Sequence, residues 1–264
     1  MEISGRTAVV TGASSGLGRA IALALSTASA NVAVVDIDRA DAEVVSAEIA
    51  QAGGISSAHR TDVAQLDEVR QLADDVYRTY ASVEILINNA GVNLRPFRAS
   101  WDTSYSDFQW IMNVNFWGVL HGHHVFVPRM LHTAGQKHIV NTSSMASLLS
   151  IAGSSAYTIS KYAVDGLSSC AREELKSQGI GVSILHPGPI RTQVAFSERR
   201  RPHDEQSETR RVKPWSEYVE QSGGGNPIIE GRFERQETYP DVAATPWEYI
   251  TANLVGHMVV EGIR

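Results

Sequence analysis

Three residues in the second half of the chain have the types and spacing of a proton-transfer site. Tyr157 is followed four positions later by Lys161, and Ser144 precedes the tyrosine by thirteen positions. Two residues four apart lie on one face of a helix, so the ammonium of Lys161 should favour the phenolate and lower the pKa of Tyr157 from about 10. A serine hydroxyl from a neighbouring segment would then orient an alcohol or carbonyl oxygen against the phenol.

The N-terminal segment has the order of strand, turn and helix that nucleotide binding requires. The apolar run at 7–10 predicts a buried parallel strand, and TGASSGLG follows it at 11–18, before a stretch of helical composition. Gly12 would permit the tight turn, Gly16 would let the backbone approach a pyrophosphate, and Gly18 would let the helix pack closely on the strand. Because glycine spacing alone is weak evidence, a purely structural turn stays as the alternative.

A second strand, predicted at 31–36, strengthens the nucleotide-binding interpretation. It ends in Asp36, eighteen residues after Gly18, close to where a carboxylate meets the adenosine ribose. A carboxylate there repels a 2′-phosphate, so the sequence predicts NAD as the cofactor, preferred over NADP. Arg39 lies near enough in sequence to soften this preference, the alternative being a solvated arginine at the start of a helix.

Between residues 5 and 195 these and other motifs, in this order, resemble those of the classical short-chain dehydrogenase/reductase family. They include Asp62-Val63, the NNAG motif at 88–91, NVNFWG around Asn115, and PGPIRT at 187–192. The resemblance implies a catalytic tetrad of Asn115, Ser144, Tyr157 and Lys161. It also implies a sheet-stabilising role for NNAG. The implied cofactor contacts are Gly12, Ser14, Ser15, Gly16, Leu17, Gly18, Asp36, Asp62, Val63, Asn89, Ala90, Gly91, Tyr157, Lys161, Pro187, Gly188, Ile190 and Thr192.

The same resemblance implies a reversible hydride transfer between NAD and a secondary alcohol or ketone. Tyr157 would act as general base in oxidation and as general acid in reduction, and Ser144 would hold the substrate oxygen. Lys161 would lower the pKa of Tyr157 and bind the nicotinamide ribose, while Asn115 would position a water that links Lys161 to solvent. Because no tetrad member is replaced, an NAD-binding regulator without turnover is the less favoured class.

The segments around these motifs alternate between strand and helix patterns. Helical patterns occupy 38–52, 66–80, 106–132 and 155–177, and strand patterns lie near 55–60, 83–88, 138–143 and 181–187. This alternation predicts an α/β protein: a single-domain Rossmann fold over residues 1–264, with a doubly wound parallel sheet of six or seven strands and helices on both faces. The seventh strand would have to lie in HMVVEG at 257–262. That uncertain ending leaves a homodimer and a homotetramer both open.

The region at about 193–240 is expected to form a lid over the substrate. Substrate contacts are expected from Asn93, Ser144, Met145, Ser154, Tyr157 and Phe196, with Trp215 and Tyr218 adding apolar surface. The stretch from WIMNVNFWGV to PGPIRT is similar to a subgroup that contains bacterial dehydrogenases for aryl secondary alcohols. A hydrophobic or aromatic alcohol is therefore expected, with a sugar or polyol as the alternative.

Composition excludes several other classes of protein. A net charge of -6 and a pI near 5.8 give no basic surface for nucleic acid. No apolar run is long enough to span a membrane and no signal-peptide pattern opens the chain, so a cytoplasmic protein is expected. The single cysteine, Cys170, is expected to pack inside a helix. His121, His123 and His124 lack a carboxylate or cysteine at ligand spacing, so no metal is expected.

Overall fold

The computed structural model describes residues 2–188, 190, 192–201 and 213–222, and its centre is a parallel sheet. Six strands lie in the order β3-β2-β1-β4-β5-β6, with parallel pairing throughout. The strands are β1 (Thr7–Thr11), β2 (Asn31–Asp36), β3 (Ile55–Arg60), β4 (Ile85–Asn88), β5 (Lys137–Thr142) and β6 (Ile180–Leu185). The strand order reverses between β1 and β4, and ligands of open α/β sheets bind outside the carboxyl ends of the strands at such a point.

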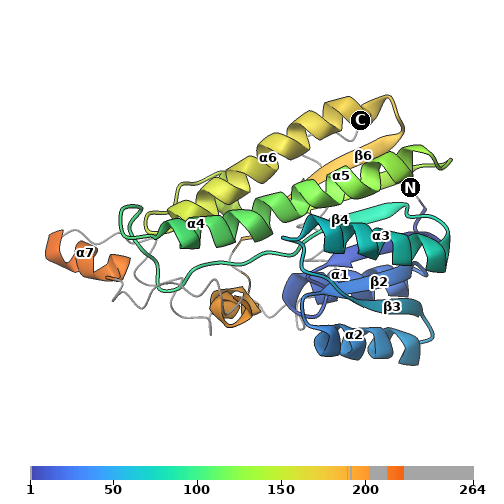
Figure 1. Ribbon diagram of the computed structural model, residues 1–264, viewed down its shortest axis with the longest axis horizontal. Coiled ribbons are helices and arrows are strands. Elements are labelled where there is room, and N and C mark those ends of the chain that lie inside the picture. The colour runs from blue at the N-terminus through green and yellow to red at the C-terminus, as the bar shows by residue number, and fades with distance from the viewer. Residues whose placement is uncertain (1, 189, 191, 202–212, 223–264) are drawn as a thin grey trace.

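Helices cover both faces of the sheet, and one helix, α7 (Trp215–Ser222), stands apart from it (Figure 1). The other helices are α1 (Gly16–Thr27), α2 (Arg39–Gln51), α3 (Leu66–Tyr80), α4 (Tyr105–Met112), α5 (Gly118–Leu131) and α6 (Ser155–Lys176), with short turns η1 (Asn113–Trp117), η2 (Met145–Ser147) and η3 (Gln193–Arg200). Successive strand residues point to opposite faces, so Val9 joins the core under α3, α5 and α6 whereas Val10 joins the core under α1 and α2. This two-sided burial explains why the strands are continuous apolar runs.

The predicted α/β fold is confirmed, with element boundaries close to those expected. One element differs: the helix predicted at 106–132 is α4, a π-helical turn η1 and α5. The flanking residues Met112 and Gly118 keep right-handed helical backbone angles, so the chain continues as a helix on both sides of the wider turn. A helical sequence pattern therefore does not show where the π-turn lies. The possible seventh strand at 257–262 lies outside the described residues, as does most of the expected lid beyond residue 201.

A buried polar network ties the centre of the sheet to the helices above it. Asn88 donates from Nδ2 to Asn141 Oδ1 at 2.8 Å, and Asn141 donates to Ser168 Oγ of α6 at 2.9 Å. His123 of α5 contacts the same Asn141 amide, and burial lowers the pKa of this histidine. A Cβ at Gly122 would lie 2.3 Å from Asn88 Oδ1. Asn88 therefore links β4 to β5, as expected of the NNAG motif.

The surface of α6 corrects one expectation. Cys170 lies in α6 but is exposed. The buried positions of this helix recur at 164, 168, 171 and 175, and residue 170 falls outside that stripe. Among the described residues, no helix combines the length and apolar character needed to cross a membrane.

Candidate active site

A cavity of about 520 Å³ opens at the carboxyl ends of the strands, where the strand order reverses. Loops that follow all six strands of the sheet contribute to its wall. All the predicted cofactor contacts lie on that wall, together with Ser144, Tyr157 and Lys161. The topology thus brings the N-terminal glycine-rich loop and the tyrosine of α6 into one site.

The glycine-rich loop is packed so tightly that its glycines cannot carry side chains. Gly12 has a φ of +64°, and a Cβ there would lie 2.8 Å from Ala90 Cα. A Cβ at Gly18 would lie 2.1 Å from Gly12 O. The loop leads directly into α1, whose first residue is Gly16. A helix N-terminus with free backbone N–H groups beside a cavity suits a pyrophosphate, so this cradle fits a dinucleotide cofactor.

Asn89 fixes the loop after β4 against the loop after β1. Its Nδ2 donates to Thr11 O at 3.0 Å, and Thr11 Oγ1 accepts from the backbone N–H groups of Asn89 and Ala90 at 2.9 and 3.1 Å. These bonds hold Ala90 and Gly91 on the cavity wall. The NNAG motif therefore shapes the cavity as well as the sheet.

Asp36 stands at the carboxyl end of β2, with 8% of its surface exposed. Its Oδ2 accepts from the backbone N–H of Ser14 at 3.1 Å and from Ser14 Oγ at 2.6 Å. Its Oδ1 accepts from the Asp38 backbone N–H at 3.2 Å. Three donors thus fix the carboxylate on the cavity wall, at the end of the strand where an adenosine ribose is expected.

Lys161 is the buried cation of the site. Its side chain projects from α6, the residue is only 3% exposed, and Nζ donates to Thr142 O at the end of β5 at 2.9 Å. Burial lowers the pKa of Lys161 to about 8, against an opposing influence from Asp165, one turn further along the helix. The lysine is therefore charged at neutral pH but holds its proton more weakly than a solvated lysine.

Tyr157 departs from the expectation that Lys161 would lower its pKa. Burial raises the pKa of Tyr157, and a hydrogen bond with the Ser144 side chain opposes that rise. Nζ of Lys161 lies 5.6 Å from the centre of the tyrosine ring and points to Thr142 O. The prediction was wrong in sign because the removal of the phenol from water outweighs the other influences on it.

Asn115 lies behind the cavity wall and is completely buried. Its Oδ1 accepts from the Val92 N–H at 2.8 Å, and its Nδ2 donates to Val92 O and to Ser160 Oγ, each at 3.0 Å. A Cβ at Gly91 would lie 3.4 Å from Asn115 Oδ1 and 3.5 Å from Lys161 Nζ. The π-turn η1 thus aims Asn115 at the loop that carries Gly91, beside the lysine.

The expected substrate contacts divide into two groups. Asn93, Met145 and Ser154 line the cavity along with Ser144 and Tyr157, whereas Phe196 is 53% exposed and is not part of the wall. Phe196 occupies a kink in the backbone of η3, and periodicity does not reveal which side such a kink faces.

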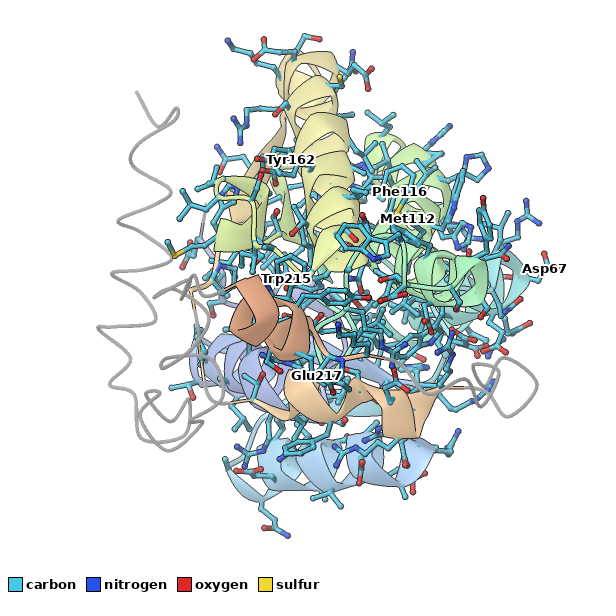
Figure 2. All side chains as sticks on the ribbon, turned by 90° about the vertical axis from the view of Figure 1, so that its left-hand side faces the viewer. Asp67, Met112, Phe116, Tyr162, Trp215 and Glu217 are labelled. Atoms are coloured by element: carbon cyan, nitrogen blue, oxygen red, sulfur yellow. The ribbon has the colours of Figure 1, made fainter. Side chains whose placement is uncertain are left out.

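Trp215 and Tyr218 of α7 also lie outside the cavity wall. They form an aromatic cluster with Trp101, with ring centres 5.7–6.4 Å apart. The backbone N–H of Trp215 donates to Phe97 O at 2.8 Å, and Phe97 lines the cavity. Figure 2 shows Trp215 on α7, facing the viewer. The pair therefore supports the wall from outside.

Sequence reasoning missed a buried ion-pair group that holds η3 to α4. Asp107 accepts from Arg98 Nη1 and from Arg201 Nη1, each at 2.7 Å, and all three residues are nearly inaccessible to solvent. Glu198 adds a 3.3 Å contact with Arg98. The partners come from separate parts of the chain, so spacing carries no signal for them.

A family model described as short chain dehydrogenase matches residues 6–203. The chain belongs to the short-chain dehydrogenase family. Among the relatives of this chain, the Mycobacterium tuberculosis protein SadH, named as an oxidoreductase, is 38% identical over 198 residues, which are 74% of this chain and 70% of SadH. The cyclohexanol dehydrogenase of an Acinetobacter species is 32% identical over 191 residues, 72% of this chain and 75% of that enzyme.

Solved structures of family members agree with the fold of this chain. A short-chain dehydrogenase/reductase from Burkholderia phymatum, in complex with NAD, aligns with a TM-score of 0.79 at 31% identity and covers 99% of this chain and 96% of that chain. A metagenomic short-chain oxidoreductase in complex with NADP aligns with a TM-score of 0.67 at 34% identity, over 72% and 84% of the two chains. The predicted family is thus confirmed, and a nicotinamide cofactor is supported.

Proposed function

We propose that the protein catalyses reversible hydride transfer between NAD and a secondary alcohol or ketone. The observation that carries this proposal is the single cavity in which Ser144, Tyr157 and Lys161 face the glycine-rich cradle. When bound, the nicotinamide ring would accept or supply the hydride. The side chains of the protein would bind, orient and exchange the proton.

Tyr157 and Ser144 would share the substrate oxygen. A phenol whose pKa is raised by burial is neutral at neutral pH, so Tyr157 is ready to donate its proton in the reduction of a ketone. In the oxidation of an alcohol the phenol must first release that proton. The ammonium of Lys161 lies on the same wall, one helical turn from Tyr157 and 5.6 Å from the centre of its ring. It would stabilise the resulting phenolate.

Lys161 and Asn115 would serve the cofactor and the proton path from Tyr157 to solvent. An ammonium has three donors, and the bond to Thr142 O uses one of those on Lys161, which leaves donors for the ribose hydroxyls of the cofactor. Asn115 would act as a positioning residue, since its amide holds the backbone of Val92 and lies, like Lys161 Nζ, next to Gly91.

The preference for NAD over NADP rests on Asp36. Its fixed carboxylate would accept hydrogen bonds from ribose hydroxyls and repel a 2′-phosphate. Related structures hold NAD in one case and NADP in another, so the preference has to be argued from this chain's own residues.

A hydrophobic substrate suits the apolar side chains of the cavity wall. Outside the predicted cofactor contacts these include Val92, Phe97, Trp110, Met145, Leu149 and Ile151. A related enzyme acts on cyclohexanol, and a cyclic or aryl secondary alcohol would fill such a pocket. Asn93 and Ser154 lie on the same wall and favour a sugar or polyol as the second candidate.

The test is NADH formation at 340 nm with cyclohexanol, 1-phenylethanol and a panel of sugars and polyols. We expect Tyr157→Phe to abolish turnover while NAD affinity is retained. Tyr162→Phe is the matched control, because Tyr162 is an exposed tyrosine of the same helix (Figure 2), and it should keep full activity. Cofactor binding with no Tyr157-dependent turnover of any alcohol would favour a regulator instead.

Self-association as a homodimer or homotetramer is part of the proposal. Trp117, Ile159 and Tyr162 expose 44%, 50% and 47% of their surfaces on η1 and α6, and exposed apolar side chains mark protein interfaces when they cluster. Ile159→Glu should lower the mass measured by light scattering if these residues form the contact. An unchanged mass would place the interface elsewhere.

A further inference from the structure

The acidic end of the cavity contains an arginine from a distant part of the chain. Arg200, the last residue of η3, lines the cavity, and its side chain is 24% exposed. Its Nη2 lies 2.7 Å from Asp41 Oδ2, and its Nη1 lies 3.3 Å from Asp38 Oδ2 and 3.9 Å from Asp36 Oδ1. η3 thereby lies against the start of α2, as the two ribbons in Figure 2 show.

These contacts place a guanidinium beside the carboxylate that would meet the adenosine ribose. Asp36 lies on the cavity wall, and Asp38 and Asp41 lie outside the wall but contact the same guanidinium. The negative charge of these carboxylates opposes a 2′-phosphate. A phosphate monoester carries between one and two negative charges at neutral pH, and arginine binds such groups through paired N–H donors. Arg200 therefore offsets the repulsion that the three carboxylates exert at this position.

Arg39, the arginine nearest to Asp36 in sequence order after β2, does not take this position. It pairs with Glu43 at 2.7 Å on the outer surface of α2, its side chain is 64% exposed, and it is not part of the cavity wall. Of the two arginines, only Arg200 lies on the cavity wall near Asp36, so Arg39 serves as the control.

We propose that Arg200 sets the discrimination between NAD and NADP, by offsetting the carboxylates of Asp36, Asp38 and Asp41 at the adenosine 2′ position. This inference rests on the proposed function, which makes the cavity a dinucleotide site. NAD has only a hydroxyl at that position and gains little from the guanidinium. NADP gains a charge-assisted contact, so the protein tolerates NADP despite Asp36.

The experiment measures the dissociation constants of NADH and NADPH by fluorescence titration at fixed ionic strength, without any substrate. Arg200→Ala should weaken NADPH binding about tenfold, since one hydrogen bond to a charged group is lost, while the constant for NADH changes by less than about twofold. Arg200→Lys should restore most of the NADPH affinity because it keeps the charge. Arg39→Ala should leave both constants unchanged.

Three results would overturn the inference while leaving the proposed function intact. Equal weakening of both cofactors by Arg200→Ala would show that Arg200 only holds η3 in place. If Arg39→Ala weakened NADPH binding as much as Arg200→Ala does, the effect would be one of overall charge. If the wild-type protein bound NADH but not NADPH, Arg200 would not offset the repulsion of a 2′-phosphate by the carboxylates. If wild-type protein bound neither cofactor, the proposed function would fail together with this inference.

Discussion

Replacement of Lys161 by methionine should make the protein more stable at neutral pH while abolishing its activity. Burial lowers the pKa of Lys161 from an ordinary value of 10.5 to about 8. Because each pH unit of this difference corresponds to about 1.4 kcal/mol, the charged lysine costs the folded protein about 3 kcal/mol below pH 8. Methionine fills a similar volume without a charge.

The gain is reduced by one lost hydrogen bond and depends on pH. Without Nζ, Thr142 O loses its donor, which costs about 1 kcal/mol, so the net gain near pH 7 is about 2 kcal/mol. As pH rises from 8 toward 10.5, the folded protein releases the proton of Lys161 while the unfolded chain still holds it. The wild type therefore regains stability in that window, and the advantage of the variant should fall by about 2.5 kcal/mol by pH 10.

Thermal or urea unfolding of the protein without cofactor, at pH 7 and at pH 10, measures both effects. A gain of about 2 kcal/mol in the free energy of unfolding corresponds to a rise of about 4–8 °C in Tm for a protein of this size. Lys176→Met is the matched control, because Lys176 is an exposed lysine of the same helix, and its effect should not vary between the two pH values. A variant less stable than wild type at pH 7, or an advantage that is the same at both pH values, would refute the reasoning.

Three further substitutions test the cradle, the ion-pair group and the ribose site. Gly18→Ala places a Cβ 2.1 Å from a backbone carbonyl oxygen of the same loop, so NADH affinity by fluorescence titration should fall at least about tenfold. Asp107→Asn removes the carboxylate that two buried arginines share, of which Arg98 keeps only the 3.3 Å contact with Glu198, and should lower the free energy of unfolding by about 3–5 kcal/mol, measured in urea. Asp36→Ala should shift the ratio of NADPH to NADH affinity toward NADPH, and an unchanged ratio would remove Asp36 from cofactor selection.

Most of the sheet and the cradle could be predicted because their signals are local. A strand buried on both faces is a continuous apolar run, so β1 and β2 are visible in the sequence alone. Gly18 is required by a contact within its own loop, with Gly12 O, and Tyr157 and Lys161 are fixed by one helical turn. In each of these cases a short segment contains its own cause, whereas Gly12 is also required by Ala90 of the loop after β4.

The remainder depends on contacts that no short segment contains. Arg200 reaches Asp41 from 159 residues away in sequence, whereas the nearer Arg39 faces solvent. The π-turn that directs Asn115 is continuous with helices at both ends, so the sequence pattern predicts one regular helix there. The sign of the pKa change at Tyr157 depends on how much protein covers the phenol, which spacing does not report.

Two features that disfavour folding lie at the cavity. The ammonium of Lys161 is buried, and η1, which contributes Asn113 and Val114 to the wall, departs from regular α-helical hydrogen bonding. Each has a more stable replacement by ordinary rules of folding, yet both occur at one cavity. Departures of this kind are expected where a site is shaped for chemistry. Stability data on Lys161→Met would separate a structural role for the lysine from a chemical one, because a structural role predicts a loss of stability and a chemical role predicts a gain.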